Sequence, residues 1–274
     1  MNLIMRKSYI IFSLIVTVAV KGCSQPISST QTLLDILEQD VLEQIEILED
    51  AGLNELLKVR SSSISETLET EKESIAEIEV TIPLYEGNPV TVLNNNIPLF
   101  TESQKEERKA CEKYENLDLL GRATGSFAIL GLETLPTEER GSIGQIKPSG
   151  WHTVKYPEVI EDLYLYNRCH LIAYCLSGEN ANEKNLVTGT RAMNLEMVSY
   201  EIMVAEYIEE SGNHVLYRAT PLYEGNDLVA KGIQLEAYSM EDKGEGIQFN
   251  VFIHNIQDGI EIDYTTGESK LSHE

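Results

Sequence analysis

The sequence predicts an α+β fold built on a central antiparallel sheet. Several segments alternate apolar and polar residues as half-buried strands do, and one longer segment, 191–210, has the apolar spacing of a helix. Strands and helices do not alternate regularly along the chain, which argues against a parallel α/β sheet. The expected strands are 78–82, 121–130, 162–166, 214–220, 232–239 and 247–254.

Length and charge limit the classes of protein that this chain can belong to. Its 274 residues allow one large domain with an appendage, or two small domains. Hydrophobic residues make up 42% and charged residues 24%, as in ordinary globular proteins. The formal net charge of -24 repels nucleic acid as a whole, because phosphate binding depends on Lys and Arg that replace counterions. Composition alone therefore makes nucleic acid an improbable ligand.

Residues 1–23 are typical of an export signal. A basic start precedes an apolar run over 9–20, which is shorter than a bilayer-spanning helix. The run ends at a small residue followed by Cys23, similar to a bacterial lipobox in which this cysteine is lipidated, although Lys21 is unusual there. The segment predicts an exported chain. We favour a cell-surface lipoprotein over an uncleaved anchor or a soluble secreted protein.

Residues 24–80 form a strongly acidic segment, with 14 acidic and three basic side chains. Apolar residues recur at helical spacing over 34–48. An acidic helical stalk is the favoured interpretation, and a short coiled coil or a docking helix for an unknown protein partner is the alternative. The predicted organisation is a signal over 1–23, a stalk over 24–80 and a globular domain over 81–274.

The candidate chemistry is centred on His170. This histidine follows an apolar strand that also delivers Arg168, a pattern that alone is more typical of a core histidine. Downstream, Asn185 and Asn194 are nine residues apart, and Glu201 lies seven residues beyond Asn194. Because seven residues make two helical turns, Asn194 and Glu201 face the same side of the expected helix.

Other residues of interest have simpler interpretations. Cys169 and Cys175 could form a disulfide outside the cell, but buried thiols are favoured. Together with His170 they lack the spacing of a zinc site. Trp151 is expected to be a core aromatic residue instead of a platform on which a base stacks.

Ordered motifs over about two-thirds of the chain carry a family resemblance. From about residue 82 to residue 269 the chain resembles the DNA/RNA non-specific endonucleases of the ββα-metal (His-Me finger) type, particularly the exported DNA-entry nucleases of Gram-positive bacteria. The resemblance implies a ββα-metal motif within the α+β fold, after the acidic helical segment. The motifs are Asn94–Pro98, Leu120–Arg122, Pro136–Arg140, Lys147–Trp151, the His170 segment, Phe249–Val251 and Asp263–Glu268.

The resemblance implies a Mg²⁺-dependent, sequence-nonspecific endonuclease that hydrolyses phosphodiester bonds of DNA, and also of RNA. His170 would be the general base. Asn194 would bind Mg²⁺, for which Mn²⁺ could substitute, and Glu201 would hold water molecules around the metal ion. Asn185 would orient His170 or one of these waters.

Two arginines are implied as phosphate clamps, because a guanidinium group matches phosphate geometry. Arg168 is the stronger candidate. Arg140 follows two glutamates, and a solvated loop charge is its equally weighted alternative.

This chain departs from the family signature Asp-Arg-Gly-His at two positions, because it has Asn167-Arg168-Cys169-His170. Asn167 removes a negative charge that could tune His170 or orient Arg168. Cys169 adds a side chain where the backbone is expected to be tight. These differences and the acidity motivate a second hypothesis, a catalytically degenerate surface lipoprotein that binds nucleic acid or a protein partner. A third is a nuclease toxin whose segment 24–80 serves delivery or inhibition.

Overall fold

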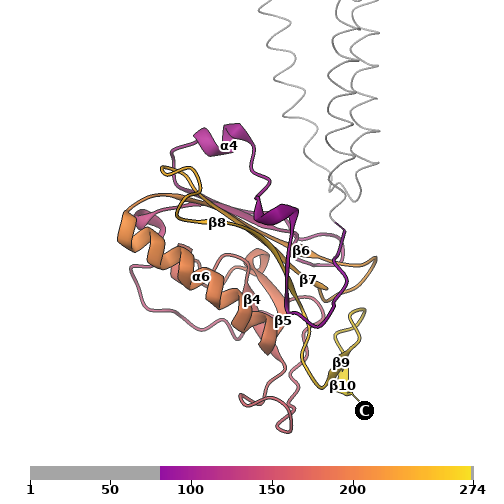
Figure 1. Cartoon of the computed structure of the whole chain (residues 1–274). Coiled ribbons are helices and arrows are strands. Elements are labelled where there is room, and N and C mark those ends of the chain that lie inside the picture. Colours follow the sequence, from indigo (N-terminus) through magenta and orange to yellow (C-terminus); the bar gives the residue numbers. More distant parts are fainter. Residues whose placement is uncertain (1–80, 273–274) are drawn as a thin grey trace, which may run out of the picture. The chain divides into compact units, whose positions relative to one another are not determined.

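The centre of the structure is a six-stranded antiparallel sheet. The computed structural model describes residues 81–272, and the predicted signal and stalk lie outside them. The strands are β1 (Val90–Val92), β2 (Cys111–Tyr114), β3 (Ser126–Leu130), β4 (Tyr166–His170), β5 (Leu186–Thr190), β6 (Val215–Leu222), β7 (Gly232–Ser239), β8 (Gln248–His254), β9 (Ile260–Ile262) and β10 (Ser269–Leu271). The central order is β1-β8-β7-β6-β3-β2, and β4–β5 and β9–β10 form two small sheets. This arrangement confirms the predicted α+β class (Figure 1).

One long helix accompanies the sheet. The helices are α4 (Glu102–Glu106), α5 (Tyr174–Ser177) and α6 (Arg191–Ser211), with 3-10 turns η1 (Asn94–Asn96), η2 (Leu132–Thr134) and η3 (Glu183–Asn185). Helix α6 begins where the Thr190 hydroxyl accepts a hydrogen bond from the backbone N–H of Met193, and ends at Gly212, which has a φ of 70°. Among the described residues no helix has the length and apolar character needed to cross a membrane.

The strongly patterned elements lie where the sequence predicts them. Strands β6, β7 and β8 and helix α6 begin and end within two residues of their predicted positions. Strand β4 starts at Tyr166, later than the expected segment 162–166, because Leu163 adopts a left-handed φ of 71° and turns the chain. Only the second half of 121–130 is a strand. The expected strand 78–82 is not found at residues 81 and 82, and its remainder lies outside the described residues.

The two faces of the central sheet carry different layers. Helix α6 and the hairpin β4–β5 cover one face (Figure 1), and together with the sheet they enclose the main core. Neighbouring residues of β6 point to opposite faces, so Tyr217 enters this core and Leu216 enters the other. The opposite core also contains Phe100, Ile129 and Met240.

A buried amide joins the hairpin β4–β5 to the central sheet. Asn255 is fully buried just after β8. Its Oδ1 accepts a hydrogen bond from the backbone N–H of Thr190 at 2.8 Å, and its Nδ2 donates to the carbonyls of Thr188 and Ala230 at 3.1 and 2.9 Å. One side chain therefore satisfies three backbone groups at the junction of the two sheets.

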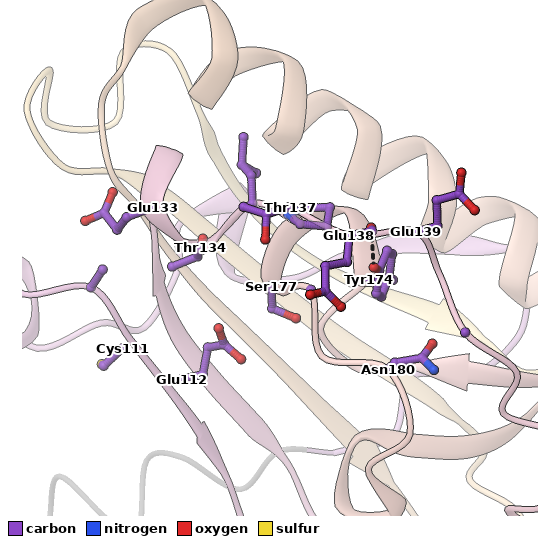
Figure 2. Close-up of a pocket in the computed structure, with 15 residues that line it drawn as sticks. Cys111, Glu112, Glu133, Thr134, Thr137, Glu138, Glu139, Tyr174, Ser177 and Asn180 are labelled. Atoms are coloured by element: carbon purple, nitrogen blue, oxygen red, sulfur yellow. Dashed lines mark hydrogen bonds between the residues drawn. The ribbon is translucent and has the colours of Figure 1, made fainter.

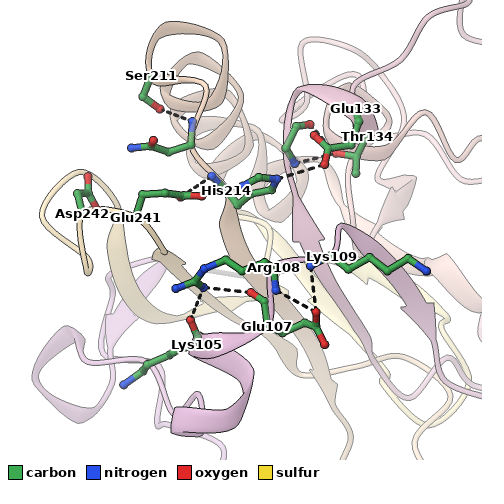
Figure 3. A network of polar contacts seen from close by, with 12 residues as sticks. Lys105, Glu107, Arg108, Lys109, Glu133, Thr134, Ser211, His214, Glu241 and Asp242 are labelled. Atoms are coloured by element: carbon green, nitrogen blue, oxygen red, sulfur yellow. Dashed lines mark hydrogen bonds and ion pairs between the residues drawn. The ribbon is translucent and has the colours of Figure 1, made fainter.

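A histidine clamp fixes η2 to the start of β6 (Figure 3). His214 Nδ1 lies 2.7 Å from a carboxylate oxygen of Glu241, and Nε2 lies 3.2 Å from Glu133. The hydrogen bond from Glu241 is the largest of the contributions that raise the pKa of His214 above its ordinary value. The clamp is thus an ion pair below that pKa, and it holds the start of the loop that leads to Arg140.

Cys169 fits its strand because the neighbouring strand supplies a glycine. Its thiol is free and buried, and burial raises its pKa. A Cβ added to Gly189 would lie 2.4 Å from Cys169 Sγ and 2.3 Å from Met193 Cε. Cys175 is a free, exposed thiol, so the prediction of buried thiols is right for Cys169 and wrong for Cys175. The pair forms no disulfide in this structure.

We expect Gly189→Ala to lower the free energy of unfolding by about 1–3 kcal/mol, because the new methyl group overpacks the contact with Cys169. In a Cys169→Ala background the loss should be smaller, since the sulfur is gone. Urea denaturation of the four proteins measures this coupling. Strictly additive losses would contradict the proposed steric contact.

Candidate active site

The His170 ring is held between a backbone carbonyl and an arginine. Its Nε2 lies 2.8 Å from the carbonyl oxygen of Asn180, and its Nδ1 lies 3.4 Å from Nη2 of Arg140. A carbonyl can only accept, so Nε2 carries the ring proton and Nδ1 carries the lone pair. The contacts therefore select one tautomer, and its basic nitrogen faces the loop that carries Arg140.

Burial sets the charge of this ring. His170 is 7% exposed, and loss of solvent lowers its pKa below the ordinary value. The Asn180 carbonyl opposes this shift, and the positive charge of Arg140 adds to it. His170 is consequently neutral at neutral pH, which is the state that a general base requires.

Asn185 fixes the chain immediately after His170. The side chain is fully buried; its Oδ1 accepts from the N–H of Ile172 at 2.8 Å and its Nδ2 donates to the Ile172 carbonyl at 2.9 Å. The Asn185 carbonyl also accepts from Leu171 N–H at 2.9 Å. Both amide atoms thus bind backbone, so Asn185 can orient His170 through the chain that follows it, and its amide makes no bond to the ring.

Helix α6 brings two oxygen-bearing side chains to the hairpin, because it packs against β4 and β5. Asn194 is half-buried in the first turn, and within residues 81–272 its side chain makes no hydrogen bond. Glu201 is 8% exposed and likewise has no hydrogen-bond partner there. Burial raises the pKa of Glu201 to about 8, and the charge of Arg140 opposes the shift.

The positive charge of Arg140 acts on both the candidate base, His170, and the buried carboxyl group of Glu201. Arg140 lies exposed on the loop after η2, and its charge lowers the pKa values of both His170 and Glu201. Arg140 is therefore within electrostatic reach of both His170 and Glu201. Arg140 is exposed, as its alternative interpretation as a solvated loop charge requires, but it also lies against the His170 ring.

Arg168 shares a face of β4 with His170, but its guanidinium group is committed to a loop. Its Nε donates to the Ile146 carbonyl and its Nη2 to the Gly144 carbonyl at 2.9 Å. The group also lies 4.0 Å from the ring centroid of Trp151. Trp151 is half-buried and packs against the small core cluster that includes Ile260 of β9, so its predicted core role is confirmed in part. The sequence favoured Arg168 over Arg140 as the residue that binds phosphate. In the structure the guanidinium group of Arg168 is bonded to two carbonyls, whereas that of Arg140 is exposed beside His170, which favours Arg140 for this role.

A cavity of about 620 Å³ lies beside the loop that carries Arg140, with Glu139 and Gly141 among its lining residues (Figure 2). Asn180 lines it, and the carbonyl of Asn180 is the group that accepts the Nε2 proton. Four carboxylate side chains also line it, from Glu112, Glu133, Glu138 and Glu139. These carboxylates disfavour a phosphate group there.

The sequence did not identify Asn180, because its contribution is a backbone carbonyl that no side-chain pattern reports. The same limit applies to metal ligands. In the part of the chain that the structure describes, no three His, Cys, Asp or Glu side chains gather closely enough to hold a metal ion. An amide oxygen, such as that of Asn194, falls outside that set.

Two antiparallel strands, with a histidine at the end of the first, and a helix packed against them form the ββα arrangement that the sequence resemblance implies. Residues 101–241, just over half of the chain, match the family model for DNA/RNA non-specific endonuclease. The chain belongs to this family.

Solved structures of related nucleases have the same fold. NucA from Streptococcus agalactiae, solved with a magnesium ion bound, is 27% identical with a TM-score of 0.62, and the match covers 73% of this chain and 96% of NucA. Sda1 nuclease, solved with a bound zinc ion, is 25% identical with a TM-score of 0.50 over 59% of this chain and 82% of Sda1. Both relatives thus bind a metal ion.

A deoxyribonuclease of Streptococcus dysgalactiae subsp. equisimilis is 31% identical over 110 residues. This match covers 38% of the present chain and only 32% of the streptococcal protein. The chain thus matches about a third of the length of that relative.

We expect Asn185→Ala to lower the free energy of unfolding by about 2–4 kcal/mol, because it leaves the buried N–H and C=O of Ile172 without partners. Asn194→Ala is the control and should change it by less than about 0.5 kcal/mol, since that amide has no bond to lose. Urea denaturation in EDTA measures both. Equal losses would contradict the structural role of Asn185.

Proposed function

We propose that this chain is a Mg²⁺-dependent, sequence-nonspecific endonuclease that hydrolyses DNA, with RNA as a second substrate. The observation that carries the proposal is the state of His170, which is buried, neutral and anchored at Nε2, with its Nδ1 lone pair directed at an exposed cation. Such a nitrogen can take a proton from water beside a phosphate group.

Arg140 covers Nδ1 in the structure, and a bound phosphate group would draw the guanidinium away. Nδ1 would then accept a proton from a water molecule whose oxygen forms a new bond to phosphorus. The phosphorus–oxygen bond on the opposite side breaks, and the leaving oxygen takes a proton from water. Arg140 would remain on the non-bridging oxygens and balance their charge.

The donor set on α6 suits Mg²⁺, which prefers oxygen ligands and retains several waters. The Asn194 amide oxygen would hold the ion, and the carboxyl group of Glu201 would accept hydrogen bonds from its waters. When bound, Mg²⁺ or a substituting Mn²⁺ supplies a Lewis acid that stabilises charge on the phosphate. Asn185 and Arg168 would act indirectly, by holding the backbone after His170 and the loop at Gly144.

Contacts to phosphate carry no sequence information, which supports cleavage without sequence preference. The net charge of -24 predicts weak, salt-sensitive DNA affinity, because only a few cations face the substrate.

Turnover is favoured over a purely binding role, since Cys169 and His170 are adjacent in β4 and point to opposite faces. The added thiol therefore does not enter the catalytic face.

The export signal supports a location outside the cell. We propose that residues 1–23 direct export, with Cys23 as a lipid attachment site, and that 24–80 act as a stalk or bind an unknown protein partner. A secreted, unanchored protein is the alternative form. Radiolabelled palmitate incorporation into the wild type and its absence from Cys23→Ala would distinguish the two.

We expect residues 24–274 to nick plasmid DNA with Mg²⁺ and to stop when EDTA is added. His170→Ala should lower the rate at least about 100-fold, because the base is lost, while the free energy of unfolding changes by less than about 2 kcal/mol. His152→Ala, an exposed histidine bonded to a loop carbonyl, is the matched control and should retain activity. Undiminished cleavage by the His170 variant would remove this residue from the base role.

The pH profile tests the electrostatics of the base. Because burial and Arg140 lower the pKa of His170, the acid limb of kcat/KM should have its midpoint below pH 6.5. Arg140→Gln removes the positive charge, makes protonation easier, and should move this midpoint upward. NMR titration of the His170 ring gives the same pKa without substrate. An unchanged value in the variant would show that Arg140 does not act on the ring.

A further inference from the structure

Tyr217 carries a buried hydroxyl group that the proposed mechanism does not use. It lies in the middle of β6, is 0% exposed, and points into the core shared with α6. Its hydroxyl oxygen is buried and has no hydrogen-bond partner within residues 81–272. A buried hydroxyl without a partner is destabilising, so such groups in folded proteins usually bond to protein or to an internal water.

Glu201 faces the same region. Burial is the main cause that raises the pKa of Tyr217, and the negative charges of Glu201 and Cys175 add to the shift. Glu201 lies on the buried face of α6 between Met197 and Val204, and both of these residues pack in the core cluster that contains Tyr217. A thiol is a weak acceptor, whereas a carboxyl group accepts strongly. Glu201 also has no hydrogen-bond partner of its own in the described chain, and most other side chains of this core are apolar.

We propose that Tyr217 is a positioning residue for Glu201, and that its hydroxyl donates to the carboxyl group through one shared buried water. A water placed between the two groups would satisfy both of them. It would also fix the rotamer of Glu201, so that the carboxyl oxygens point consistently towards the waters around a metal ion near Asn194. This inference rests on the proposed function, because it assigns Glu201 a task in holding Mg²⁺.

The first test compares Tyr217→Phe with the wild type by calorimetric titration with Mg²⁺, without substrate. We expect Mg²⁺ affinity to fall about 10-fold, as for other residues that orient metal-binding groups. On plasmid DNA kcat should fall while KM is unchanged. Tyr223→Phe is the matched control, because that buried hydroxyl is bonded to the Ala123 carbonyl and should leave Mg²⁺ affinity unchanged. Unchanged Mg²⁺ affinity in Tyr217→Phe, with a higher melting temperature, would overturn the proposal.

A double-mutant cycle in EDTA tests the contact without metal or activity. Glu201→Met removes the acceptor, so Tyr217→Phe should change the free energy of unfolding much less in that background than in the wild type. Glu201→Gln keeps an acceptor, so there the effect of Tyr217→Phe should persist. Equal effects in the wild-type and Met backgrounds would overturn the inference.

These outcomes separate the inference from the proposed function. A wild type that cuts no DNA but shows the coupling would refute the nuclease mechanism and leave the contact standing. If the wild type cuts DNA but the effects of the two substitutions are additive, the contact between Tyr217 and Glu201 is refuted and the nuclease mechanism stands.

Discussion

The candidate site depends on buried amide side chains that hold a small hairpin in place. Strands β4 and β5 form a sheet of their own, and their exposed backbone groups need partners if the hairpin is to remain fixed. Asn255 supplies three hydrogen bonds where β5 meets the central sheet, and Asn185 supplies two just after His170. Both amides are uncharged, so these bonds do not change with pH. Titration of His170 or Glu201 therefore does not alter the hydrogen bonds with which these two amides hold the hairpin in place.

Within that frame, burial determines the chemistry. Loss of solvent keeps His170 neutral and makes the Glu201 carboxyl a weak acid, while Arg140 remains exposed and charged beside both. This arrangement resolves the conflict between an acidic chain and a polyanionic substrate. A phosphate group responds to the local field near Nδ1, whereas the overall charge of -24 affects affinity and its dependence on salt.

The sequence predicted the elements whose patterns are long. Strands β6 to β8 and helix α6 repeat their apolar spacing over several residues, so local periodicity was sufficient. Short strands such as β1 and β5 are stabilised by pairing and by Asn255, which are contacts between distant parts of the chain. Strand β4 was displaced because the left-handed conformation of Leu163 leaves no periodic signal.

For the site, residue types were easier to predict than contacts. The resemblance selected His170, Asn194 and Glu201, and the structure places α6 against the hairpin that carries His170. Spacing could not show that the Asn185 amide binds backbone, or that Arg168 holds a loop while Arg140 faces the ring. These distinctions depend on side-chain direction in three dimensions.

The contact between Cys169 and Gly189 shows that motif positions are not independent. Taken alone, a cysteine at the glycine position of the signature suggests a damaged nuclease. In the structure its sulfur occupies the space that Gly189 leaves open on the adjacent strand. Restoring the glycine at 169 alone would leave a void beside Met193 instead of recreating the family geometry. The effect of a substitution at either position therefore depends on the residue at the other, because the two share one space.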